Sequence, residues 1–266
     1  MINDKYWAVF KISWEQGLVY RLNFILWRVR SILQLLLVYF IWWTVFQSQT
    51  QVFGYSKSTI LSYILVAALI RAIVLSSRVT DITNQINDGS IVNFLVKPLG
   101  FIKYYLARDV ADKLLNISFV ILEISLFVVF LKPQIIIQTN LVVLFLFLLA
   151  AFLGIILYFC VSFLISLTAF WVENSWGPLF LIMIFLEGFG GGLFPIDILP
   201  KNFFDILMLT PFPYFIYFPS KLYLGTMSSG EIVSGFVILS IWVVTSWFIM
   251  TWVFRAGLRH YTAVGH

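Results

Sequence analysis

Long uncharged apolar segments alternate with short polar segments along most of this chain. A helix needs about 20 mainly apolar residues to cross the roughly 30 Å hydrocarbon core of a bilayer. Segments near that length recur from end to end, which predicts an all-α integral membrane protein with six transmembrane helices. The predicted spans cover residues 24–47, 58–80, 104–131, 141–170, 176–190 and 231–254.

Residues 3–22, ahead of the first predicted span, follow an amphipathic pattern instead. Apolar residues recur at spacings of three and four, at Trp7, Phe10, Trp14 and Leu18, and charged residues lie on the opposite side. Such a helix lies in the membrane interface with its aromatic side toward the acyl chains. The alternative is a plain polar segment that leads into the first span.

The stretch 133–172 carries no charge over forty residues, which is long enough for two spans. Only Gly154 interrupts its middle, and no cluster of turn residues marks a reversal of the chain. We therefore predict one long helix over 141–170. The alternative, a hairpin of two spans, would place the two termini on opposite sides of the membrane.

Residues 193–230 are apolar but contain five prolines and several charges, so they fit no continuous span. Irregular backbone at membrane depth persists only where it is packed on protein or lines a cavity. We predict short helices that re-enter the outer leaflet before the last span.

Residues 81–103 form a long polar segment between the second and third predicted spans. Inside it, the apolar residues 91–96 lie between the turn formers 88–90 and Pro98. Asp or Ser can cap the first turn of a helix, and proline ends one. This predicts about two helical turns whose apolar face nothing in the loop covers. The face is either a docking element for a partner or a solvated loop on the lipid surface. Its candidate residues are Asp88, Gly89, Ile91, Val92, Phe94, Leu95, Lys97 and Pro98.

Composition indicates that the chain lies in a membrane, and the distribution of charge indicates its orientation there. Hydrophobic residues make up 61% of the chain and charged residues 11%, whereas soluble domains carry about 25% charged residues. Of the 17 Lys and Arg residues, twelve fall on the predicted inner segments and four on the outer ones. This excess places both termini, including the tail 255–266, in the cytoplasm. The net charge of +5 suits an anionic inner leaflet and does not imply nucleic-acid binding.

Candidate catalytic chemistry is sparse. Cys160 is the one cysteine, both histidines lie in the tail, and no Walker A sequence occurs. The residues that a nucleophile–base pair or a metal cluster would need therefore do not come together in the predicted spans. We predict a protein without catalytic residues or a metal site of its own.

Three charges fall inside or near predicted spans, where charges are costly and are often functional. Arg71 and Glu123 lie on consecutive spans and would pair if the third span started late. A structural pair, or an Arg71 that reaches the headgroups, is favoured over a proton relay. Arg28, at the inner end of the first span, is also expected to reach the headgroups. The third charge is Glu187.

Glycines follow Glu187 directly, at Gly188, Gly190, Gly191 and Gly192. Gly188 and Gly192 have the small-xxx-small spacing that lets two helices approach closely. A break that serves helix packing is favoured here over a hinge in a substrate path.

Several short motifs resemble the permease subunits of ABC-2 type transporters, in particular their bacterial six-span branch. One lies in the polar segment, as Asp81-Ile82, Gly89-Ser90-Ile91 and Leu95-Val96-Lys97-Pro98-Leu99. A second is FGGGLFPIDILP at 189–200 with the prolines and Gly225 that follow, and a third is the ending at 259–265.

This resemblance implies a six-helix protomer with an interfacial connecting helix at the N-terminus. Two permeases, identical or related, would pair with two separate ATP-binding subunits, which hold the ATP and Mg²⁺. The loop between the second and third spans would carry the coupling helix that seats on the ATPase. The family mostly exports lipids, glycans, drugs or peptides, and here the bacterial cytoplasmic membrane is implied.

We therefore expect the permease of an ATP-driven exporter, with a substrate path at the permease–permease interface. Spans one, two and five would line that path. One alternative is a secondary transporter driven by protons through Glu123 and Glu187. Another is a membrane scaffold or immunity protein that moves no substrate.

Overall fold

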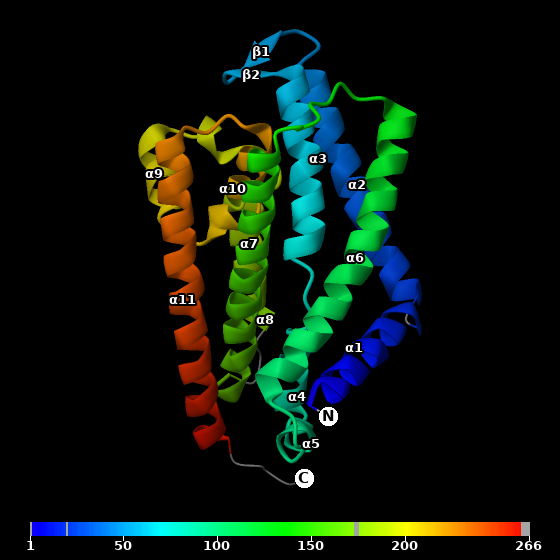
Figure 1. The fold of residues 1–266 in the computed structure, drawn as a ribbon, viewed down its shortest axis with the longest axis vertical. Coiled ribbons are helices and arrows are strands. Elements are labelled where there is room, and N and C mark those ends of the chain that lie inside the picture. Colours follow the sequence, from blue (N-terminus) through cyan, green and yellow to red (C-terminus); the bar gives the residue numbers. More distant parts are fainter. Residues whose placement is uncertain (1, 20, 173–175, 262–266) are drawn as a thin grey trace.

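The computed structural model describes residues 2–19, 21–172 and 176–261, and these form an elongated bundle of helices (Figure 1). Residues 262–265 of the C-terminal motif lie outside the described residues. In the described ranges, five helices are long and apolar enough to cross a membrane. They are α2 (Arg21–Val45), α3 (Lys57–Val74), α6 (Phe101–Leu131), α7 (Leu141–Leu167) and α11 (Ser229–His260).

The fifth predicted span is shorter than the others. It forms α8 (Trp176–Phe189), which has 14 residues and is therefore about 21 Å long at 1.5 Å per residue. That length falls short of the roughly 30 Å of a bilayer core. The fold is an all-α membrane protein, with five long helices and this shorter apolar one among the described residues.

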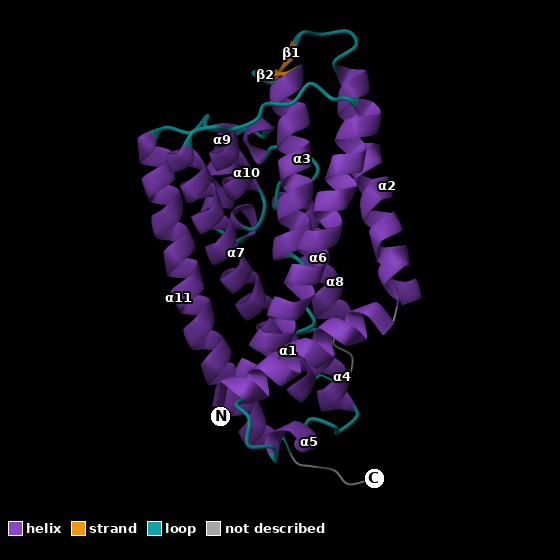
Figure 2. Cartoon of the chain, turned by 45° about the vertical axis from the view of Figure 1, so that its right-hand side comes forward, coloured by secondary structure: helices purple, strands orange, loops and turns teal. Residues whose placement is uncertain are grey.

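The N-terminal segment forms α1 (Ile2–Val19), which is inclined to the long helices at their lower end (Figures 1 and 2). Its Trp7 and Phe10 rings stack with their centroids 5.0 Å apart. The hydroxyl of Tyr6 accepts a hydrogen bond from the backbone N–H of Gly100 at 3.2 Å. This bond joins α1 to the residue that precedes α6.

The uncharged stretch forms the single helix α7, which continues into the short helix η1 (Thr168–Phe170). Asn140 caps its start by accepting a hydrogen bond from the N–H of Val142 at 2.9 Å. Gly154 lies in mid-helix, where an added Cβ would be 3.2 Å from the backbone oxygen of Tyr214. The glycine therefore permits a close contact and does not end the helix, so the one-helix interpretation is correct and the hairpin alternative is wrong.

Short helices form in the proline-rich region. They are η2 (Ile196–Ile198), α9 (Lys201–Met208), η3 (Phe212–Tyr214) and α10 (Tyr217–Leu224). Aromatic residues from the end of η3 to the start of α10 are buried, with Tyr214, Phe215 and Phe218 fully so. They pack in one core cluster with residues of α3 and α7. Irregular backbone here is thus covered by protein, as a low-polarity environment requires.

A polar cluster ties these short helices to the hairpin of β1 (Gln51–Val52) and β2 (Tyr55–Ser56) at the upper end of Figure 1. The Tyr55 hydroxyl donates to Asp197 Oδ2 at 2.7 Å, and Lys221 Nζ donates to the Tyr55 oxygen at 2.7 Å. Burial and the hydrogen bond to Asp197 raise the pKa of Tyr55. The phenol therefore stays protonated and keeps its role as a donor.

Two glycines on α11 are predicted to respond differently to substitution by alanine. A Cβ at Gly235 would lie 2.2 Å from Cε2 of Phe218, a fully buried ring, whereas a Cβ at Gly230 would meet no atom within 4 Å. We expect Gly235→Ala to lower the free energy of unfolding by about 1–3 kcal/mol, because overpacking forces side chains off their rotamers. Gly230→Ala should leave it unchanged or slightly higher. Thermal unfolding in detergent measures both, and equal midpoints would contradict this packing.

Candidate functional site

The polar segment between α3 and α6 folds into two short helices, α4 (Asp81–Asn87) and α5 (Val92–Leu95). The predicted docking helix of about two turns is therefore a single turn of four residues. Asp88 Oδ1 accepts a hydrogen bond from the N–H of Ser90 at 2.9 Å, and Gly89 has a φ of +76°. Hydrogen bonds from Ser90 lower the pKa of Asp88. These residues make a turn between α4 and α5, which leaves fewer residues for the second helix.

The predicted apolar face is partly covered by the chain itself. Ile91 is fully buried, in a cluster with Ile82 and with aromatic residues of α6 and α7. Phe94 is half-buried, and its ring centroid lies 5.1 Å from that of Tyr104. The expectation that nothing in the loop covers this face is wrong for Ile91, which clusters with Ile82 of the same segment as well as with residues of α6 and α7.

The exposed part of the segment is its tip. Val96 has 77% of its surface exposed, and Lys97 and Pro98 are also exposed. Among the other predicted docking residues, Asp88 is exposed and Gly89 and Val92 are half-buried, while the side chain of Leu95 lies outside the described part. We call Val96, Lys97 and Pro98 the exposed tip. It directly follows α5, which lies at the lower end of Figure 1, near the start of α1 and the end of α11.

Ion pairs and hydrogen bonds fasten this segment to α6. Arg108 Nη2 lies 2.8 Å from Asp81 Oδ2 at the start of α4. Tyr105 donates a hydrogen bond to Gln85 Oε1 at 2.6 Å. The loop after α3 is held in the same way, since Arg78 Nε lies 3.0 Å from Asp112 Oδ1. These contacts fix the segment to the first half of α6.

Lys113 of α6 caps the end of α3. Its side chain is buried, and its Nζ donates to the backbone oxygens of Ile73, Val74 and Ser76 at 3.2, 3.2 and 2.5 Å. The last carbonyl groups of a helix have no partner within it, and a cation at that end is favourable. Asp109 Oδ2, 3.5 Å away, balances the charge.

This cap was not predicted from the sequence, which only placed Lys113 among the inner positive charges. A signal was present, since Asp109 and Lys113 have the i, i+4 spacing of a pair on one helix face. What the spacing could not give is the second helix, because the carbonyl groups that Lys113 binds belong to α3.

The intramembrane charges pair differently from the prediction. Arg71 binds Glu187 of α8 with both terminal nitrogens, each at 2.6 Å, and not Glu123. Glu123 pairs with Arg28 of α2 at 2.5 Å, so Arg28 is buried and does not reach the headgroups. The predicted pair needed a late start of the third span, whereas α6 starts at Phe101.

Glycines after α8 make room for this pairing. A Cβ at Gly192 would lie 2.1 Å from Arg71 Nη2, and Gly191 has a φ of +83°. A Cβ at Gly190 would lie 2.4 Å from the backbone oxygen of Leu186, whereas one at Gly188 would meet no described atom within 4 Å. The predicted small-xxx-small contact therefore does not form at Gly188 among the described residues. The run serves to end α8 and to let Arg71 approach.

Among the described residues, no three His, Cys, Asp or Glu side chains form a group that could hold a metal ion. The notable chemistry of the site is thus the exposed tip, the buried polar contacts behind it and the two arginine–glutamate pairs.

The pattern that defines a family described as "ABC-2 family transporter protein" matches residues 32–265, which is most of the chain. No curated protein and no solved structure matches it.

The Lys113 cap predicts a loss of stability on substitution. Lys113→Met leaves Asp109 as a buried charge without its cation, which costs about 3–5 kcal/mol. Lys103→Met, an exposed position on the same helix, should cost less than about 0.5 kcal/mol. Adding Asp109→Asn to Lys113→Met should recover part of the loss. Unfolding midpoints in detergent compare the variants, and equal midpoints for the two lysine variants would refute the cap.

Proposed function

The chain belongs to the ABC-2 family of transporter proteins, and on that premise we propose that it is the permease subunit of an ATP-driven exporter. In this proposal the chain forms the membrane path and contains no catalytic residue. ATP and Mg²⁺ bind to two separate ATP-binding subunits, and a second permease, identical or related, completes the complex. The apolar helices form a multi-pass protein in the cytoplasmic membrane of a bacterium.

The observation that carries the proposal is the exposed tip with its fixed base. A partner that pushes on Val96 or Lys97 meets no free loop, because Asp81 and Gln85 bind the start of α6. Lys113 then joins α6 to the end of α3. A displacement of the tip is thus passed to two long helices at once, as alternating access by rigid-body motion needs.

The chemistry of the tip suits a groove on a partner protein. It presents an apolar side chain, Val96, beside a cation, Lys97, whose Nζ lies 4.7 Å from the centroid of the Phe94 ring. Protein–protein contacts commonly combine an apolar centre with a polar rim. The ring of Phe94 holds the lysine in place and is itself packed on Tyr104.

The orientation of the chain in the membrane follows from the end that carries the exposed tip. The exposed tip, α1 and the last turn of α11 lie together there (Figure 1), and the segments predicted as inner carry twelve Lys and Arg residues. Positive residues concentrate on the cytoplasmic side of membrane proteins, which is where ATP-binding subunits are found. We therefore place this end in the cytoplasm.

A proton-driven transporter would need Glu123 and Glu187 to bind and release protons. Each of these carboxylates already accepts two hydrogen bonds from one arginine side chain. That arrangement supports a role in structure or binding and favours the ATP-driven proposal.

A negative charge at the exposed tip should abolish its coupling to the ATP-binding subunit. We expect Val96→Asp to reduce the amount of co-purified ATP-binding subunit at least tenfold, because about 1.4 kcal/mol of lost contact free energy suffices for that and burying an unpaired charge costs more. The matched control is Phe53→Asp, an exposed apolar position (67% exposed) in the hairpin at the opposite end. Gentle detergent purification of each tagged variant gives the ratio of the two chains, and the ATPase rate is measured on the same samples. Retention of the subunit by Val96→Asp at the level of the control would remove the tip from the mechanism.

A further inference from the structure

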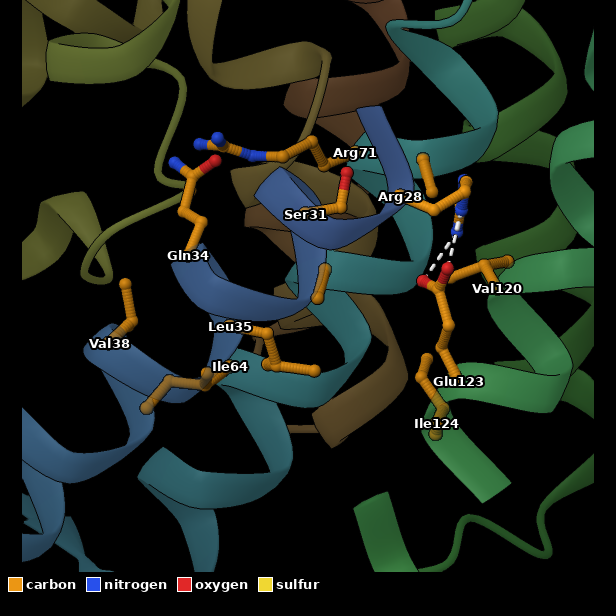
Figure 3. A pocket seen from close by; sticks show the side chains of 13 residues that line it. Arg28, Ser31, Gln34, Leu35, Val38, Ile64, Arg71, Val120, Glu123 and Ile124 are labelled. Carbon is orange, nitrogen blue, oxygen red and sulfur yellow. Dashed lines mark hydrogen bonds and ion pairs between the residues drawn. The ribbon is translucent and has the colours of Figure 1, made fainter. Parts of the chain in front are cut away.

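A cavity of about 60 Å³ lies between α2, α3 and α6, beside the ion pair of Arg28 and Glu123. Figure 3 shows this pair on one side of the cavity and the ends of Arg71 and Gln34 on the other, with Ser31 between them. The remaining walls are mainly apolar and include Leu35, Ile64, Ala68 and Val120. The cavity therefore separates two groups of polar side chains inside the bundle.

Arg71 and Gln34 have bonding capacity that no described residue uses. The two terminal nitrogens of Arg71 each donate one hydrogen bond to Glu187, which is not part of the cavity wall, whereas a guanidinium has five N–H donors. The amide nitrogen of Gln34 donates to the same carboxylate at 3.3 Å, which leaves its amide oxygen as a free acceptor. Neither side chain has a fully buried polar atom without a partner. A molecule the size of water can therefore reach the unused atoms.

The opposite side of the cavity has unused capacity as well. Arg28 donates from Nε and Nη2 to Glu123 and from Nη1 to Asn116, and the other two of its five N–H groups stay free. Each carboxylate oxygen of Glu123 accepts one of these bonds and has lone pairs for another. The Ser31 hydroxyl donates to the backbone oxygen of Trp27 at 3.0 Å and can still accept. Donors and acceptors thus face the cavity from both sides.

The size and charge of the cavity favour water as its occupant. A volume of about 60 Å³ equals roughly two water molecules of the liquid. Cavities with purely apolar walls stay dry, whereas polar ones hold water that makes about three hydrogen bonds per molecule. An anion here would lie against Glu123, and a cation would lie against two guanidinium groups. Hydrocarbon offers no hydrogen bonds to polar groups at membrane depth, so a neutral molecule with donors and acceptors fits best.

We propose that this cavity binds two ordered water molecules that connect Arg71 and Gln34 to the Arg28–Glu123 pair. Hydrogen bonds through water are enthalpically nearly as good as direct ones, so the two ion pairs become parts of one network. Asn116 extends the network, because its amide nitrogen donates to Asp112 Oδ2 at 3.2 Å. The waters thus supply the links that join polar contacts of α6 to those between α3 and the end of α8.

Oxidation by hydroxyl radicals tests for the bound water. Short X-ray pulses produce these radicals from water, and a side chain beside a bound water is oxidised even where bulk solvent does not reach it. Ile64 lines the cavity and Ile60, one turn earlier on α3, does not, although both are buried. The full chain is irradiated in detergent, and mass spectrometry measures oxidation at each residue. We expect at least fivefold more oxidation at Ile64 than at Ile60, and equal oxidation would overturn the proposal.

Variants tie the oxidation of Ile64 to this cavity. Ala68→Leu fills the cavity with an apolar side chain and should lower the oxidation of Ile64 to the level of Ile60. The matched control is Ala107→Leu, the same change at a half-buried alanine of α6 that does not line the cavity, and it should retain the oxidation. Ala72→Leu, at another lining position, replaces Ala68→Leu if that variant does not fold. Unchanged oxidation of Ile64 in a folded cavity-filled variant would overturn the assignment.

Thermal unfolding tests whether the water connects the two sides. Gln34→Leu and Glu123→Gln remove one partner from each side of the cavity. Because a shared network makes such changes non-additive, we expect the midpoint shift of the double variant to differ from the sum of the single shifts. In the Ala68→Leu background the shifts should add. Additive shifts in the unmodified background would overturn the connection. Neither experiment needs ATP or a partner subunit, so the outcome is independent of the permease proposal.

Discussion

A helix that ends among apolar side chains leaves carbonyl groups that only the protein can satisfy. Helix α3 ends at Val74, and the ammonium group of Lys113 binds the carbonyl oxygens there. Because that lysine belongs to α6, the solution to a local problem of α3 fixes two helices to each other. The chain leaves α3 from this fixed point, so the position of α4, and of the exposed tip beyond it, depends on the same contact. Loss of such a contact costs about 3–5 kcal/mol, which is a large part of the 5–15 kcal/mol that stabilises a typical domain.

The same constraint decides which charges pair within the bundle. A charge at membrane depth needs a counter-charge that its neighbours place within reach, and α2 rather than α3 supplies the partner of Glu123. Arg71 is thereby left for Glu187, and the approach is possible because Gly192 has no side chain in the way. The Arg28–Glu123 pair is nearly buried and holds α2 to α6. The Arg71–Glu187 pair is more exposed and joins α3 to the end of α8.

The long helices could be predicted because length and apolar composition alone decide them. The stretch 141–170 is the clearest case, since nothing in it could end a helix and α7 runs through it as one. The partner of Arg71 and the burial of Ile91 could not be predicted, since both depend on which distant helices lie alongside. The length of the helix predicted before Pro98 was overestimated, because Asp88 and Ser90 form a turn as readily as a helix cap. Lys113 shows most clearly what the sequence could not predict. Its spacing on α6 predicts a pair with Asp109, whereas its contacts with the carbonyl groups of α3 depend on how the two helices pack.

The end of α3 links the exposed tip to the Arg71–Glu187 pair. Arg71 precedes Val74 by three residues, about 4.5 Å along the axis of α3, so the capped end of the helix and the open ion pair lie within one turn of each other. If a partner displaces the exposed tip, Lys113 carries the end of α3 with it, and the distance from Arg71 to Glu187 changes unless α8 follows. If that displacement changes the strength of the Arg71–Glu187 pair, thermodynamic reciprocity requires that a change in the pair alters the affinity of the partner for the tip by the same factor. The coupling then runs through one rigid element with a defined contact at each end, which is the physical basis that a claim of communication between sites requires.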